Sequence, residues 1–310
     1  MEIMKNININ FMGKRKLAMN FSALLIVVSI ASLFIQGLNL GLDFSGGSLI
    51  EVGYQQSVET EGVRNTLSKA GYDEAIVTHF GSAKAVLIKV APREGLSNAD
   101  LSSDILRALR IADSSVDMRR VEFVGPQVGE ELREDGGMAM LFAIIGILIY
   151  VALRFEYRFA LGSVAALLHD VIITLGVFSV LQLDFDLTVL AAILAVIGYS
   201  LNDTIVVFDR IRENFRRVRN GSSEEVINQS LNQTLSRTLM TSITTMMVLV
   251  ALFFLGGALI HGFASALIVG VVVGTYSSIY VASALVLAMG VSKADLMPVE
   301  KEGADIDDMP

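Results

Sequence analysis

Val196 to Phe208 reads Val-Ile-Gly-Tyr-Ser-Leu-Asn-Asp-Thr-Ile-Val-Val-Phe and places one carboxylate, that of Asp203, inside an otherwise apolar segment. Such a segment is typical of a membrane-spanning helix, where a buried charge costs about 2.5 to 3.5 kcal/mol on insertion scales. Ionisable residues inside spans are therefore rare and mark functional positions. Arg237 stands at the mouth of the next apolar segment. The two residues together predict a helical bundle that binds and moves protons.

The composition indicates a multi-span membrane protein. The chain has 310 residues, of which 53% are hydrophobic, and its mean hydropathy of +0.59 is far above that of soluble proteins. It contains no cysteine, which excludes disulfides, thiolate metal sites and cysteine nucleophiles. A net charge of −8 without a basic face is unlike a nucleic-acid-binding protein. Without a Walker motif, metal-ligand cluster or nucleophile triad, we expect no enzyme and no cofactor, with protons as the coupling ion.

Six apolar runs have the length needed to cross about 30 Å of hydrocarbon. They are Leu17–Gln36, Gly136–Leu153, Phe159–Leu181, Leu187–Phe208, Leu239–Leu255 and Phe263–Met289. The first run follows a basic cluster, as the apolar core of a signal peptide would. It is too long for such a core, and five more spans follow it, so we predict an uncleaved anchor.

The positions of Lys and Arg predict how the spans are oriented. Basic residues lie before the first span, between the second and third, and after the fourth. They include Lys5, Lys14, Arg15, Lys16, Arg154, Arg158, Arg210, Arg212, Arg216, Arg217 and Arg219. The connections 182–186 and 256–262 contain none. The positive-inside rule therefore predicts cytoplasmic ends at 1–16 and 290–310 (the latter an acidic tail), a cytoplasmic connection at 209–238 within the five-helix region 136–289, and a periplasmic domain at 37–135.

The periplasmic segment is long enough to fold as a domain. Val58–Ala70 and Asn98–Ala112 have helical periodicity, and Ser97 or Asn98 can cap the second helix. The β-rich segments are Ser48–Tyr54, Ala75–Phe80, Ala85–Ala91 and Met118–Val124. The resulting order, βαββαβ, predicts a ferredoxin-like sandwich with both helices on one side of one sheet.

Two glycine-containing segments join this domain to the spans. Gly46 and Gly47 precede its first strand, and Gly125 and Pro126 follow its last. A phosphate-binding loop would need a helix directly after the glycines, whereas a strand follows the first pair. Hinges or tight turns are the remaining interpretations, and hinges would let the domain move relative to the bundle.

Polar residues on the fourth and fifth spans are the candidate proton relay. Asn202 is beside Asp203, and Arg237 and Thr241 are one turn apart on a hydroxyl-lined stripe that should face the bundle interior. An Asp203–Arg237 pair is geometrically plausible. A carboxylate beside a guanidinium can exchange a proton when its partner moves, because burial raises a carboxyl pKa and pairing lowers it. The alternatives are a structural salt bridge and an arginine that snorkels to the interface.

The third span carries a second polar position, His169 and Asp170. Asp170 is either a further proton station or a hydrogen-bonded brace between helices. Neighbouring helical residues point about 100° apart, so we do not expect both side chains to face one partner. Small residues predict close helix packing at Gly198, Gly270 and Gly274, although a Gly-x-x-x-Gly step is a weak signal alone.

These segments together resemble the SecF family of protein-export membrane subunits, part of the wider RND transporter superfamily. The resemblance covers nearly the whole chain, and the run Gly-Tyr-Ser-Leu-Asn-Asp-Thr-Ile-Val-Val-Phe-Asp-Arg, at residues 198–210, is its most specific part. The other matching segments are Gly41–Gly47, Val124–Leu132 and Arg237–Thr245. The resemblance implies that Asp203 is the proton-linked acid and Arg237 its basic partner. It also implies a bacterial inner-membrane location, with SecD, the SecYEG translocon, YajC, unfolded preprotein and membrane lipids as partners.

The sequence thus predicts a Sec translocase accessory subunit that uses the proton motive force to help complete protein export. One alternative is an RND-type proton-coupled exporter of small or lipidic molecules, against which the small outer domain argues. A loss-of-function strain that is drug-sensitive but secretes normally would favour that alternative. A second alternative is a structural brace, for which Asp203→Asn would be silent while changes at Gly270 or Gly274 would be damaging.

Overall fold

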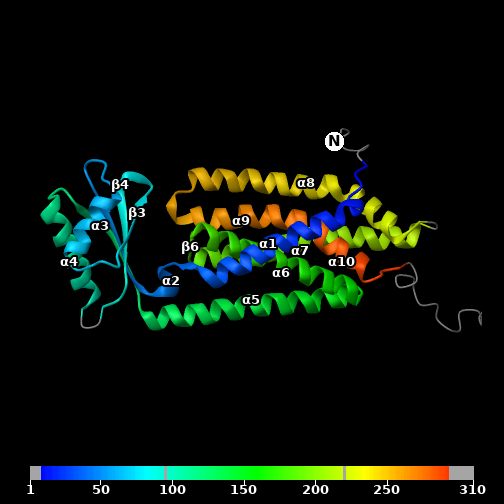
Figure 1. The fold of residues 1–310 in the computed structure, drawn as a ribbon, viewed down its shortest axis with the longest axis horizontal. Helices are drawn as coiled ribbons and strands as arrows, with labels where there is room; N and C mark the ends of the chain where they lie inside the picture. Colours follow the sequence, from blue (N-terminus) through cyan, green and yellow to red (C-terminus); the bar gives the residue numbers. More distant parts are fainter. Residues whose placement is uncertain (1–7, 94–95, 219–220, 293–310) are drawn as a thin grey trace, which may run out of the picture.

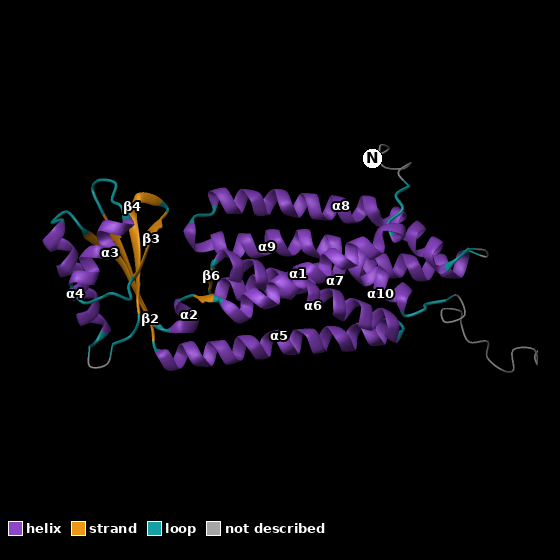
Figure 2. Ribbon diagram, viewed as in Figure 1, coloured by secondary structure: helices purple, strands orange, loops and turns teal. Residues whose placement is uncertain are grey.

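The computed structural model describes residues 8–93, 96–218 and 221–292, and it shows an elongated helical bundle with a small α/β domain at one end (Figures 1 and 2). Within these described ranges, six helices are long and apolar enough to cross a membrane, as predicted. The bundle elements are η1 (Met12–Lys14), α1 (Arg15–Ile35), α5 (Pro126–Arg154), α6 (Tyr157–Leu181), α7 (Leu187–Arg217), α8 (Ser223–Leu255) and α9 (Ala258–Ser277), with α9 continued by the π-helical turn η2 (Ser278–Ala282) and by α10 (Ser283–Ala288). Lys5 and the acidic segment Glu300–Asp308 lie outside the described residues.

The predicted connection at residues 209–238 is largely helical. The fourth-span helix, α7, continues to Arg217, and α8 begins at Ser223 and runs without a break into the fifth span. A capping box begins α8: the Ser222 N–H donates to the Glu225 carboxylate, and the Glu225 N–H donates to the Ser222 hydroxyl. With 31 and 33 residues, α7 and α8 are about 46 and 50 Å long at 1.5 Å per residue, so both exceed the hydrocarbon thickness.

The six spans differ in how much of their surface the chain itself covers. The centre of the bundle is α6 and α7, whereas α5 and α8 lie at its edges and are mostly exposed. The exposed apolar residues of the outer helices include Phe21, Val27 and Phe34 on α1, Phe142 and Ile149 on α5, and Met247 and Phe254 on α8. A bilayer is an apolar solvent, so these side chains are accommodated by lipid or by another membrane chain.

The α/β domain contains one antiparallel sheet and two helices. Its elements are β2 (Gly47–Gly53), α3 (Thr60–Lys69), β3 (Ile76–Phe80), β4 (Ser82–Val90), α4 (Asn98–Ala112) and β5 (Asp117–Val124), in the predicted order βαββαβ. Strand order in the sheet is β3-β4-β2-β5. Both helices cover one face, where Ile50, Val86 and Ile88 meet Leu67 and Ile105 in a common core. The predicted cap at Ser97 is present, since its hydroxyl accepts from the Asp100 N–H.

The two connections between domain and bundle lie against each other. Gly46 and Gly47 have positive φ angles of 66° and 123°, which non-glycine residues avoid. A Cβ on Gly46 would lie 3.0 Å from the Cα of Pro126, the first residue of α5. A Cβ on Gly47 would lie 2.5 Å from the Val90 carbonyl oxygen. Both glycines therefore permit a close crossing of backbones as well as a tight turn, and Gly125 is extended at φ −64°.

A short two-stranded ribbon lies between the sheet and the bundle. It is formed by β1 (Asn39–Leu40) and β6 (Asp184–Phe185), which pair in parallel, and α2 (Leu42–Ser45) follows β1 directly. The Lys89 ammonium, on β4, donates to the Leu40 carbonyl. Burial lowers the pKa of Lys89, and the charge of Asp184 partly offsets that effect. This polar contact attaches the α/β domain to the outer rim of the bundle.

Candidate proton-binding sites in the bundle

Asp203 lies in the middle of α7, on the buried face of the helix. Its side chain is 3% exposed, and Val207 and Ser200, which share that face, are also buried. The Oδ2 atom of Asp203 is buried without a hydrogen-bond partner among the described residues. A carboxylate in this situation costs free energy as long as it is charged, and it gains from protonation or from a donor supplied from outside the chain.

The groups that act on Asp203 from the neighbouring helix are Thr241 and Arg237 of α8, the first through a hydrogen bond and the second through its charge. Neither group donates a hydrogen bond to the Oδ2 atom of Asp203. Arg237 is itself exposed, as is Asn202 beside the carboxylate. The structure therefore places the predicted pair on adjacent helices and leaves the guanidinium accessible at the side of the bundle.

The prediction that the whole polar stripe of α8 faces the interior of this bundle is wrong. Ser230 and Thr234 are buried, but Arg237 and Thr244 are exposed and Thr241 is half-buried. The stripe follows one face of α8, which lies at an edge of the bundle (Figure 1). Most of the buried residues of α8 lie in its first part, between Val226 and Thr238. The hydroxyls of Thr241 and Thr244 donate to backbone carbonyls of α8 itself, whereas Arg237 lies at the exposed side of the helix.

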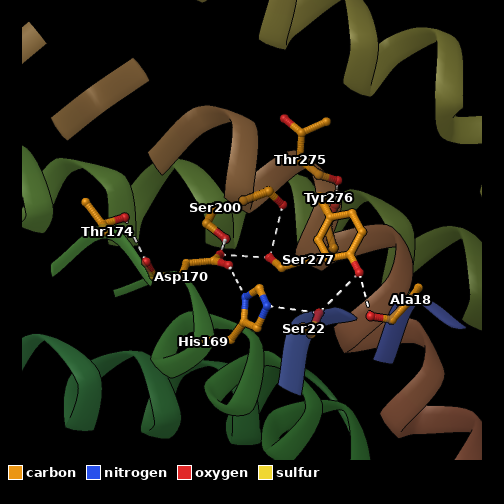
Figure 3. Close-up of polar contacts among 11 residues, drawn as sticks. Ala18, Ser22, His169, Asp170, Thr174, Ser200, Thr275, Tyr276 and Ser277 are labelled. Carbon is orange, nitrogen blue, oxygen red and sulfur yellow. Dashed lines mark hydrogen bonds and ion pairs between the residues drawn. The ribbon is translucent and has the colours of Figure 1, made fainter. Parts of the chain in front are cut away.

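Asp170 is completely buried on α6 and has all its oxygens in hydrogen bonds (Figure 3). Its Oδ1 atom is 2.9 Å from His169 Nδ1. Its Oδ2 atom accepts from the Ser200 hydroxyl of α7 at 2.5 Å and from the Ser277 hydroxyl of α9 at 2.8 Å. Its backbone carbonyl accepts from Thr174 at 2.7 Å. The carboxylate thus links three helices through contacts made entirely within the chain.

The polar network continues from His169 towards α1. His169 Nε2 lies 3.1 Å from the Ser22 hydroxyl, which donates to the Tyr276 hydroxyl at 3.2 Å. Tyr276 in turn donates to the Ala18 carbonyl at 2.8 Å, one helical turn before Ser22. His169, Ser22, Tyr276 and Asp170 therefore form one connected hydrogen-bonded chain (Figure 3).

The expectation that His169 and Asp170 face different partners is confirmed, because His169 contacts Ser22 of α1 while Asp170 contacts hydroxyls of α7 and α9; their contact with each other was not predicted. The two side chains contact each other, and His169 reaches α1 with its other nitrogen. Rotation about the side-chain bonds overcomes the backbone angle between neighbouring residues, because an imidazole can turn either nitrogen towards a neighbouring carboxylate.

Several members of this network were not predicted from the sequence: Ser22, Ser200, Tyr276 and Ser277. One signal was available on the first span, where Ser22, Ser29 and Ser32 all turn out to be buried. Hydroxyl groups at this spacing on an apolar helix indicate an interhelical face. Nothing in the spacing indicates that Tyr276, more than 250 positions away, is the partner of Ser22.

Two of the three predicted packing glycines lie in close helix contacts. A Cβ on Gly270 would lie 2.1 Å from Val196 Cγ2, and one on Gly274 would lie 3.0 Å from Ser200 Cβ. The two glycines therefore let α9 approach α7 closely at the level of the Asp170 site. The prediction for Gly198 is wrong within this chain, because its Cβ position has no neighbour within 4 Å and the residue is exposed.

The fold and these sites define a multi-pass helical membrane protein with buried titratable groups on its central helices and one α/β domain after its first span. Comparison with known proteins is specific. A sequence model of the family "Protein export membrane protein SecD/SecF, C-terminal" matches residues 104–292, and one of the "SecD/SecF GG Motif" matches residues 31–58. The second match includes Gly46 and Gly47.

Characterised relatives agree with these matches. "Protein translocase subunit SecF" of Vibrio alginolyticus is 55% identical over 305 residues, covering 97% of each chain, and that of Pseudomonas aeruginosa is 49% identical over 304 residues, covering 97% of this chain and 98% of its own. The crystal structure of SecDF, a translocon-associated membrane protein from Thermus thermophilus, superposes with a TM-score of 0.85 at 41% identity. This match covers 93% of the present chain but only 39% of the SecDF chain. The chain belongs to the SecD/SecF family of protein-export membrane proteins, and within it to the SecF proteins.

Proposed function

We propose that this protein, as an accessory subunit of the Sec translocase, uses the proton motive force to help complete protein export across the inner membrane. The observation that carries the proposal is the Asp203 carboxyl, buried in the middle of α7 with an unpartnered Oδ2 atom, with exposed Arg237 on the adjacent α8. The names of the relatives support the export role, and they do not favour the exporter of small molecules.

Proton exchange at Asp203 changes the forces between α7 and α8. The ionised carboxylate attracts Arg237 and accepts from Thr241, whereas the protonated carboxyl has no net charge to attract the guanidinium. One elementary charge that crosses 100 mV supplies about 2.3 kcal/mol. This energy biases a two-state arrangement of the helices by roughly fifty-fold.

The α/β domain is the part through which the bundle acts on a preprotein in this proposal. Its strand order, β3-β4-β2-β5, is the arrangement expected of a ferredoxin-like domain, and we place it in the periplasm by the positive-inside rule. The same rule places both ends of the chain in the cytoplasm. Gly46, Gly47, Gly125 and Pro126 would be the joints about which the domain moves. The entering and leaving connections cross closely at Gly46 and Pro126, so both could bend at the same place, as a hinge requires.

A partner chain would complete the Asp203 site. Asn202 and Arg237 are exposed on spanning helices, where lipid supplies no hydrogen bonds. SecD is the partner we propose for this face, since the SecDF chain from Thermus carries a SecF-like part within a longer chain that includes SecD by its name. We further propose SecYEG, YajC and unfolded preprotein as components of the assembly, with lipid around the exposed apolar faces. In this proposal the chain is not an enzyme, needs no cofactor, and has the proton as its coupling ion.

The test is the advance of a stalled preprotein in inner-membrane vesicles after ATP removal, with an imposed proton gradient. Vesicles with wild-type protein should advance the preprotein, and vesicles with Asp203→Asn should not, although the variant is assembled. Asp186→Asn is a matched control on the same helix, because Asp186 caps the start of α7 and Asn caps equally well. Equal advance with wild type and Asp203→Asn would refute the relay and leave the structural brace as the explanation.

A further inference from the structure

We propose that His169 and Asp170 form a second proton-binding site, which exchanges its proton with solvent through Ser22 and Tyr276 at the end of the bundle where α1 begins. The proposal rests on the proposed function only for its role in export. The proton-binding site itself follows from the directions of the hydrogen bonds in the network.

The directions are determined from one end of the chain to the other. The Ala18 carbonyl can only accept, so the Tyr276 hydroxyl uses its single proton there. The Tyr276 oxygen must then accept a hydrogen bond from the Ser22 hydroxyl. The single hydroxyl proton of Ser22 is used in this bond. The Ser22 oxygen must in turn accept from His169, so His169 Nε2 carries a proton. This assigns a tautomer that the imidazole geometry alone leaves open.

A second proton must lie between His169 Nδ1 and Asp170 Oδ1. These atoms are 2.9 Å apart, and without a proton two lone pairs would face each other. The proton is either on Nδ1, which gives an imidazolium–carboxylate pair, or on Oδ1, which gives a neutral imidazole and a carboxylic acid. In both forms the pair is neutral overall and stores one exchangeable proton in a region where an unpaired charge is costly.

Release of that proton follows the same chain. His169 Nε2–H transfers its proton to the Ser22 oxygen, Ser22 transfers its own to the Tyr276 oxygen, and Tyr276 releases its own to water. The imidazole keeps the remaining proton on Nδ1 and donates to the Asp170 carboxylate, which the Ser200 and Ser277 hydroxyls stabilise. One proton leaves, and the pair retains one negative charge.

A surface pocket lies beside the α1 end of this route, where Tyr276 itself is half-buried. The pocket has a volume of about 630 Å³ and is lined by Arg15, Lys16, Met19, Asn20 and Glu224 together with residues of α10. Met19 and Asn20 follow Ala18 directly, and Ala18 is the acceptor of the Tyr276 proton. The pair itself is sealed, since His169 and Asp170 are 2% and 0% exposed, so proton exchange requires a relay.

The surroundings of the pair contain few other groups that titrate. From α1 it meets Ser22, from α7 it meets Ser200, and from α9 it meets Tyr276 and Ser277. The nearest carboxylate in sequence on α7 is Asp203, three residues after Ser200 and therefore on the same face of the helix. Ser200 accordingly connects the charge state of Asp170 to the position of the segment that carries Asp203.

The proposal is tested by infrared spectroscopy of the purified full-length protein as it exchanges into D₂O. Asp170→Asn should remove one carboxylic-acid or imidazolium signal from the spectrum, and that signal should differ from the one removed by Asp203→Asn. Tyr276→Phe should leave the signal in place and slow its exchange several-fold, because the relay has lost its hydroxyl. Tyr280→Phe is the matched control, because the Tyr280 ring lies 5.3 Å from the Tyr276 ring, centroid to centroid, but Tyr280 is not part of the hydrogen-bonded chain from His169 to Ala18.

Two spectroscopic results would overturn the proposal. A spectrum unchanged by Asp170→Asn would show that the pair stores no proton, and equal exchange rates in Tyr276→Phe and Tyr280→Phe would show that Tyr276 carries none. Neither measurement requires preprotein, so the site can stand or fail separately from the role of Asp203. In the vesicle assay, a working relay predicts that Tyr276→Phe slows gradient-driven advance and increases its solvent deuterium isotope effect. A slower advance with an unchanged isotope effect would show a structural role and contradict the relay.

Discussion

The two buried aspartates of the bundle, Asp170 and Asp203, differ in how completely the chain satisfies them. Asp170 has partners for both carboxyl oxygens, supplied by α6, α7 and α9. Asp203, three residues beyond Ser200 on α7, retains an unpartnered Oδ2 atom and lies beside exposed Asn202. Burial alone therefore does not distinguish a carboxyl that is satisfied within the chain from one that faces a partner. The hydrogen-bond donors around each carboxyl make that distinction.

The largest effect should come from removing the internally satisfied carboxyl. Asp170→Leu leaves the Ser200, Ser277 and His169 groups buried without their partner, so we expect a loss of about 3 to 5 kcal/mol in the free energy of unfolding. Asp203→Leu should change it little, because the unpartnered oxygen is removed with the charge. Thermal unfolding of both variants in the same detergent compares them. A larger loss in Asp203→Leu would reverse the comparison.

The packing beneath the Asp170 site should be the next most sensitive feature. Gly270→Ala places a methyl group against Val196, and such overpacking costs about 1 to 3 kcal/mol. Gly198→Ala is the same substitution at an exposed position with free space, where alanine gains up to about 1 kcal/mol in helix propensity. Denaturation of the two purified variants should therefore shift in opposite directions. Equal shifts would contradict the close α7–α9 contact.

At the Asp203 site, substitutions should affect coupling and leave stability unchanged. Arg237→Lys keeps the charge but loses the planar guanidinium, so we expect gradient-driven preprotein advance to fall by about tenfold, and Arg237→Gln to abolish it. Because Arg237 is exposed, the free energy of unfolding should stay within about 0.5 kcal/mol for both variants. Full activity of Arg237→Lys would show that only the charge is used.

The smallest effect concerns the hydroxyl that acts on Asp203. Thr241→Val has nearly the same shape and removes one hydrogen-bonding group, which is worth about 1 kcal/mol. Gradient-driven advance should therefore fall about fivefold. Thr245→Val, one turn further along and also half-buried, is the control and should retain the wild-type rate. A similar loss in both variants would indicate a general effect on α8.

Much of this protein is determined by local rules that act along the sequence. The length and apolarity of the runs predict six spans, because hydrocarbon thickness and helix rise set the number of residues required. The caps at Ser97 and Ser222 follow from hydroxyl groups placed before a helical pattern. Asp203 could be singled out since one carboxylate in an apolar span is conspicuous by composition alone.

The tertiary structure decides which polar groups meet. His169 turns towards Asp170 and Ser22, and Ser22 meets Tyr276 from the other end of the chain. The outward position of Arg237 follows from the place of α8 at the edge of the bundle. Periodicity states which residues share a face of a helix, but not which helix covers that face. Which helix covers a face depends on the packing of all the helices together. As a result, both carboxyl oxygens of Asp170 have hydrogen-bond partners within the chain, whereas Oδ2 of Asp203 has none among the described residues.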